Sequence, residues 1–140
     1  MRKFEFRLER VRQYRRQLED QAKKELMETQ LRVRQAEKEL EEMLDHRRQM
    51  LENALGTVGE RMNTLNYVSF LDEKCASQES IIAILRQDED MMRNQWMAAR
   101  RDAELLEKLK TKAKDEYDLD LSRFEQAELD EWTMMRRDVA

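Results

Sequence analysis

Cys75 and His46 are the residues of this sequence whose side chains could act as a nucleophile, a general base or a zinc ligand. A nucleophilic cysteine needs a base beside it, and a zinc site needs several such ligands at short spacings. The chain has one cysteine, one histidine and no Gly-rich phosphate-binding loop. We therefore predict no enzyme activity, no catalytic residue, no metal, no cofactor and no internal disulfide. Cys75 is expected to be a small buried residue and His46 a solvated helix residue.

Charged side chains make up 41% of the residues and are the other candidates for chemistry. The arginines of the first 16 residues and the stretch LKTKAK could contact phosphates, but acidic residues adjoin each basic run and the formal net charge is -4. We therefore expect no nucleic-acid partner. A peripheral membrane-surface coiled coil is an alternative, because the start of the chain is basic and amphipathic.

The composition indicates long exposed helices, with two glycines and no proline among 140 residues. A compact globule at this charge density would bury ions without partners. No run of 18 apolar residues is present, and the opening MRKFEFRLERVRQYRR lacks the apolar core of a signal peptide. We expect a cytoplasmic protein with no integral membrane segment.

Two apolar seams run along the sequence, one on each side of LGTVGERMN at residues 55–63, where Gly56 and Gly59 favour a helix end. The first seam repeats about every 3.6 residues, as on a straight helix. Both seams are buried only if the two helices fold back on each other. The sequence therefore predicts an all-α fold, a long two-helix antiparallel coiled coil or helical hairpin. The first seam is Phe4, Leu8, Val11, Tyr14, Leu18, Ala22, Leu26, Thr29, Val33, Ala36, Leu40, Leu44, Arg47, Leu51 and Leu55, and the second runs from Val68 to Phe124.

The register of this hairpin is predicted from charge. Residues 1–16 carry seven Arg or Lys against two Glu, and residues 115–140 carry nine acids against three Arg, so the two ends attract. We favour the register in which Phe4 and Phe6 meet Trp132 and Met135. The alternative is a register set by a short turn at 56–62. The prediction is one elongated domain over 1–140, with helix 1 at about 4–56, a connector at about 57–80 that can contain short helices, and helix 2 from about 66 or 80 to 137.

The predicted connector contains MNTLNYVSFLDEKCASQESII, the least charged part of the chain. Apolar residues at the tip of a two-helix hairpin have few internal partners to cover them. They either cap the core of the hairpin or form a site for a partner.

Three stretches together resemble the flagellar FliJ family, a soluble part of the type III protein-export apparatus. They are the opening FEFRLERVRQYRRQLEDQAKKEL, the mid-chain YVSFL, and LEKLKTKAKDEYDLDLSRFEQAELDE at residues 106–131. The resemblance covers essentially the whole chain. Its most specific part is LEKLK followed by Tyr117, Arg123, Glu125, Gln126 and then LDE at 129–131.

The resemblance implies a coiled coil similar to the central stalk of rotary ATPases. The implied partners are the hexameric flagellar export ATPase, whose ring form it promotes, the export-gate membrane protein, and export chaperones that it escorts, at the inner membrane of the flagellar base. Lys74 departs from the apolar residue expected one turn after Phe70. A generic cytoplasmic coiled-coil scaffold or spacer is the alternative. Carried over to this chain, the ATPase-binding residues are Phe4, Phe6, Leu8, Val11, Phe124, Leu129, Trp132 and Met135, and the gate-binding residues are Tyr67, Phe70 and Leu71.

Overall fold

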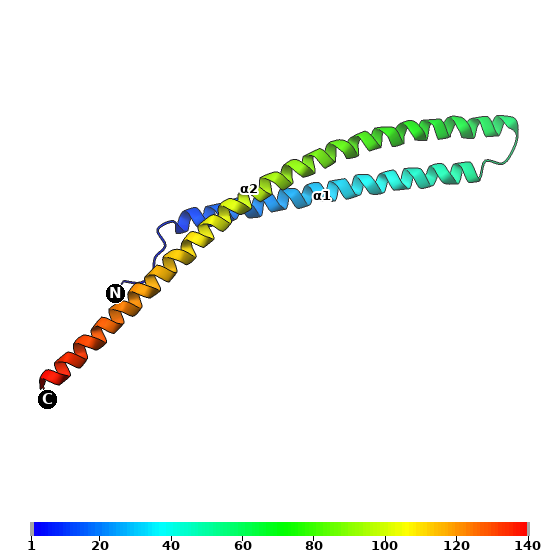
Figure 1. The fold of residues 1–140 in the computed structure, drawn as a ribbon. Helices are drawn as coiled ribbons and strands as arrows, with labels where there is room; N and C mark the ends of the chain where they lie inside the picture. Colours follow the sequence, from blue (N-terminus) through cyan, green and yellow to red (C-terminus); the bar gives the residue numbers. More distant parts are fainter. Residues whose placement is uncertain (1, 140) are drawn as a thin grey trace. The chain divides into compact units, whose positions relative to one another are not determined.

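A computed structural model describes residues 2–139, which form two long helices and no strand (Figure 1). Helix α1 spans Glu9–Glu52 and helix α2 spans Val58–Val139. The two helices pack against each other and run antiparallel. The structure therefore confirms the predicted all-α helical hairpin.

The turn between the helices is short, because a capping box starts α2 directly after Gly56. The hydroxyl of Thr57 accepts a hydrogen bond from the backbone N–H of Glu60 at 3.3 Å, and the Glu60 carboxylate accepts one from the backbone N–H of Thr57 at 3.2 Å. Gly56 has a φ of 134°, a conformation that L side chains rarely adopt. Gly59 lies inside the first turn of α2. The connector expected at 57–80 is thus wrong, since this segment is the beginning of α2.

Contacts divide the chain into two compact units, each containing part of both helices. The central unit comprises residues 21–97, and the terminal unit comprises residues 1–20 and 98–140.

In the central unit, buried and half-buried residues follow one another at alternating spacings of three and four, the heptad pattern of a coiled coil. On α1 this seam includes Met43 and Met50, whereas Leu44 and Leu51 are exposed. The expected repeat of 3.6 residues is wrong there, because two supercoiled helices keep a repeat of 3.5 against each other. The expected α2 seam is confirmed from Val68 to Leu106 and includes buried Cys75.

Gln78 is a buried polar member of the central seam. Its side-chain amide donates a hydrogen bond to the backbone carbonyl of Ala36 on α1 at 2.9 Å and another to the Glu39 carboxylate at 3.3 Å. A buried amide costs free energy unless it is hydrogen-bonded, and only one alignment of the helices provides these acceptors. Gln78 therefore favours the observed register.

In the terminal unit, α1 begins five residues later than expected, at Glu9 rather than near Phe4. Val11 and Tyr14 are exposed, and the half-buried positions that replace them are Arg12 and Arg15. These arginines pair with acids of α2, which offsets the cost of their partial burial.

The register differs from the one favoured by charge. The Phe4 ring lies 5.5 Å from the Tyr117 ring, and Arg12 pairs with Glu107 at 2.6 Å, so the start of the chain packs beside residues 102–117. The expected meeting of Phe4 and Phe6 with Trp132 and Met135 is wrong. The seam and the capping box determine the register, because attraction between exposed charges contributes at most about 1 kcal/mol per pair.

Candidate protein-binding surfaces

The last part of α2, residues 122–138, is the first candidate surface, and we call it the free end. All of its side chains are exposed, and Trp132 retains 56% of its accessible area. In Figure 1 this segment continues α2 past the start of the chain, with no other described segment of the terminal unit beside it. Leu121, Phe124, Glu128, Trp132 and Met135 fall on one face at helical spacing, which continues the seam of α2 from Tyr117.

That face is apolar except for Glu128, and charged residues border it. Leu129 is exposed on its flank, and the guanidinium of Arg136 lies 4.6 Å from the ring of Trp132. Apolar side chains that are grouped on one face and exposed to solvent are typical of protein-binding surfaces. The free end can therefore take a second helix as its partner.

The start of the chain forms a strap along α2. Residues 2–6 have no regular secondary structure, and Phe4 and Phe6 are half-buried. The Tyr117 hydroxyl donates a hydrogen bond to the backbone carbonyl of Arg2. The Lys114 ammonium lies 5.0 Å from the Phe4 ring and 5.1 Å from the Tyr117 ring, so it makes cation–π contacts with both. Leu8 and Val11 follow as exposed residues.

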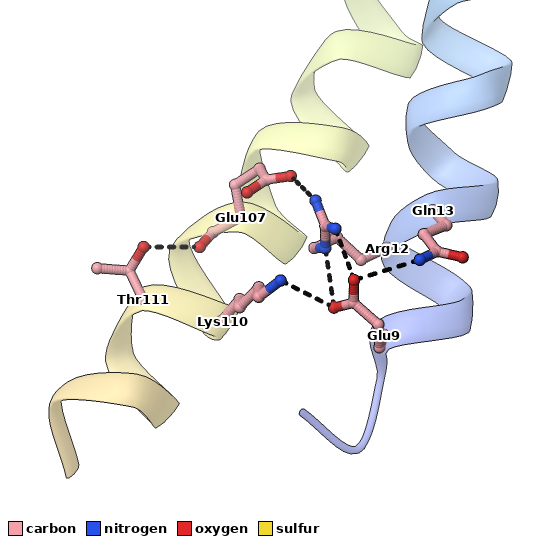
Figure 2. Close-up of polar contacts among 6 residues, drawn as sticks. All are labelled: Glu9, Arg12, Gln13, Glu107, Lys110 and Thr111. Carbon is pink, nitrogen blue, oxygen red and sulfur yellow. Dashed lines mark hydrogen bonds and ion pairs between the residues drawn. The ribbon is translucent and has the colours of Figure 1, made fainter. Parts of the chain in front are cut away.

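An ion-pair cluster fastens the first turn of α1 to α2 (Figure 2). The Glu9 carboxylate accepts hydrogen bonds from Arg12 at 2.6 and 3.0 Å and pairs with Lys110 of α2 at 3.1 Å. Arg12 also reaches Glu107 at 2.6 Å. Hydrogen bonds from Arg12 and then Lys110 lower the pKa of Glu9 to about 2, and those to Glu9 and Glu107 raise the pKa of Arg12.

The second candidate surface is in the central unit, around Phe70. The groove beside it has a volume of about 380 Å³. Phe70 is 47% exposed, whereas Leu71 retains only 4% of its accessible area because it faces α1. We call this surface the Phe70 groove, and its lining residues are Met43, Phe70, Glu73, Lys74, Ser77, Gln78 and Ile81.

The aromatic residues beside this groove are held in place by their neighbours. Tyr67 is exposed, and its ring lies 6.1 Å from that of Phe70. His46 of α1 hydrogen-bonds the Tyr67 hydroxyl at 3.2 Å and contacts its ring edge-on. The Lys74 ammonium lies 4.9 Å from the Phe70 ring. Position 74, where an apolar residue was expected, is thus a lysine that contacts the Phe70 ring.

Residues 4–137 match the protein family described as flagellar FliJ protein. This chain belongs to the flagellar FliJ family. It is therefore a protein related to flagellar export. No curated protein sequence and no solved structure matches the chain.

In this FliJ-family chain the expected ATPase-binding residues form two groups. Phe4 and Phe6 lie on the strap, Leu8 lies in the turn before α1, and Val11 lies in the first turn of α1. Phe124, Leu129, Trp132 and Met135 lie on the free end. The structure does not pair the two groups. Tyr67 and Phe70 of the expected gate-binding residues are exposed together, whereas Leu71 is buried.

Sequence reasoning did not find three features of these surfaces: the cation–π contacts of Lys114 with Phe4 and Tyr117, the Glu9 ion-pair cluster, and the contact between His46 and Tyr67. A lysine one turn before an aromatic residue could have indicated the contact of Lys114 with Tyr117. Contacts between helices need the register, which spacing alone did not supply. Among residues 2–139 no three His, Cys, Asp or Glu side chains are grouped to hold a metal, and no helix is long and apolar enough to cross a membrane.

Proposed function

We propose that this protein is a non-enzymatic, stalk-like component of the flagellar type III export apparatus that binds the hexameric export ATPase through the free end of α2. The observation that carries the proposal is the apolar face of Phe124, Trp132 and Met135, which continues the seam of α2 where α1 is absent. A helix face of this kind is buried when a partner helix takes the place of α1. The strap, with Phe4 and Phe6, adjoins this face at Tyr117.

Binding of this kind stimulates the ATPase by assembly alone. A ligand that binds the ring and not the separate subunits stabilises the ring by mass action. The stalk then raises hydrolysis without supplying a catalytic group. Most of its seam residues are apolar, and most of its acids lie on exposed helix faces.

The Phe70 groove is the proposed contact for the export gate, and it lies in a different unit from the free end. Tyr67 and Phe70 offer exposed aromatic area, which is typical of binding hot spots. Leu71 is buried in the core and offers no such area. The same chain would thus link the ATPase to the gate, escort export chaperones, and act in the cytoplasm at the inner membrane of the flagellar base.

The test combines the purified chain with the export ATPase of its own apparatus and measures phosphate release and ring formation. The double variant Phe124→Ala, Trp132→Ala should lose most of the stimulation while its far-ultraviolet circular dichroism is unchanged, because both side chains are exposed in the free protein. The variant Tyr67→Ala, Phe70→Ala should keep the stimulation and lose binding to the cytoplasmic domain of the export gate.

A matched control is Met27→Ala, Met91→Ala, which removes two exposed apolar side chains from other positions of the helices. It should behave as the unmodified chain in both assays. Absence of stimulation by the unmodified chain, or equal losses from all three variants, would favour a generic coiled-coil scaffold instead.

A further inference from the structure

The central unit carries a second groove that the proposed function does not use. Its volume is about 330 Å³, and it shares no lining residue with the Phe70 groove. Leu44, on its floor, is 47% exposed although it lies beside the seam. We call it the acidic groove; its floor is Leu40, Leu44, Ile82 and Ala83, and its rim is Glu37, Glu41, Glu79 and Arg86.

The rim is negative. Its single cation, Arg86 of α2, is already paired with Glu37 of α1 at 2.7 Å. Glu41 and Glu79 are exposed and form no ion pair with any residue of 2–139. Two carboxylates, one from each helix, thus remain free beside an apolar floor.

We propose that the acidic groove binds a basic amphipathic helix of a partner protein. An apolar stripe on that helix would cover Leu44 and the edge of Ile82, and Lys or Arg on its two flanks would meet Glu41 and Glu79. The negative rim repels nucleic acid and anionic membranes, so neither class of partner fits. This inference does not depend on the proposed contacts with the ATPase or the gate.

The geometry matches how a third helix adds to an antiparallel pair. The ion pair between Arg86 and Glu37 joins the two helices at the rim of the groove. Leu40 and Ile82 are already packed in the seam, so only the outer side chains need to adapt. A helix bound there would bury the Leu44 side chain, which is exposed to solvent in the hairpin alone.

The experiment titrates the full chain into a fluorescently labelled synthetic helix with leucines on one face and lysines on both flanks. A second peptide carries glutamate in place of each lysine. We expect binding of the lysine peptide that weakens as salt is raised, and none of the glutamate peptide. The variant Glu41→Lys, Glu79→Lys should weaken binding about tenfold, since two attractive contacts become repulsive. Leu44→Gln should also weaken it without loss of helicity.

The matched control is Glu28→Lys, Asp88→Lys, which changes the net charge equally at two exposed acids outside the groove. It should bind as the unmodified chain does. Equal weakening by this control would overturn the proposal, because attraction to the whole acidic protein would then explain the binding. A photo-crosslinker on the leucine face of the peptide should label α1 near residue 44 and α2 near residue 83. Labelling confined to the Phe70 groove or the free end, or a groove-dependent self-association that excludes the peptide, would overturn it as well.

Discussion

Glu9 fastens the start of α1 to α2 through contacts with both helices. Its carboxylate is shared by Arg12 of its own helix and Lys110 of the partner helix. Charge-assisted hydrogen bonds hold it ionised, which is why its pKa falls from 4.5 to about 2. The sequence shows these three charges but not their meeting, because the choice among many acids depends on the register.

The depressed pKa of Glu9 predicts a pH dependence of stability. A carboxylate with a lower pKa in the folded state stabilises the fold above its unfolded pKa, and this contribution is lost as pH falls from about 4.5 to about 2. The variant Glu9→Gln should therefore unfold at a lower temperature than the unmodified chain at neutral pH. The difference should shrink across that acid range, as followed by circular dichroism.

The control for this pH series is Glu5→Gln, at an exposed acid that forms no ion pair within residues 2–139. It should not reproduce the difference seen with Glu9→Gln. A constant difference between the Glu9 variant and the unmodified chain from neutral pH to pH 2 would contradict the role of the ionised carboxylate.

At the scale of elements, the decisive feature is the capping box of Thr57 and Glu60, which ends the turn and begins α2. Thr-x-x-Glu before a helical segment is a recognisable sequence signal. The connector at 57–80 was predicted instead because the register favoured by charge required it, whereas Val68, Leu71, Cys75 and Gln78 are consecutive seam positions of α2. Gly56 was correctly identified as the helix break.

Removal of the cap tests this assignment. Thr57→Ala should lower the free energy of unfolding by about 1 kcal/mol, since the backbone N–H of Glu60 loses its acceptor. Thr111→Ala is the matched control, because the Thr111 hydroxyl bonds the Glu107 carbonyl inside α2 and alanine is the better helix former. The control should be neutral or slightly stabilising in urea unfolding. Equal destabilisation by the two variants would contradict the capping role.

At the scale of the whole molecule, composition and residue spacing predicted the fold class and the α2 seam. The sequence motifs predicted the family. The register was predicted wrongly, because opposite charges at the ends of the chain suggested an alignment that exposed ion pairs are too weak to impose. In the observed register, Leu121 is the last half-buried seam residue of α2, and the helix continues beyond it without α1 beside it. Phe124 and Trp132, expected to pack on the start of the chain, are consequently exposed and open to a partner.

Hydrogen exchange of α2, with and without the export ATPase, tests the central claim most directly. An unpaired helical segment opens easily in water, so amides of residues 122–138 should exchange much faster than those of residues 99–117 in the isolated chain. Addition of the ATPase should protect residues 122–138. Strong protection of that segment in the isolated chain would contradict the register, and unchanged rapid exchange in the presence of a bound ATPase would contradict its role as the docking surface.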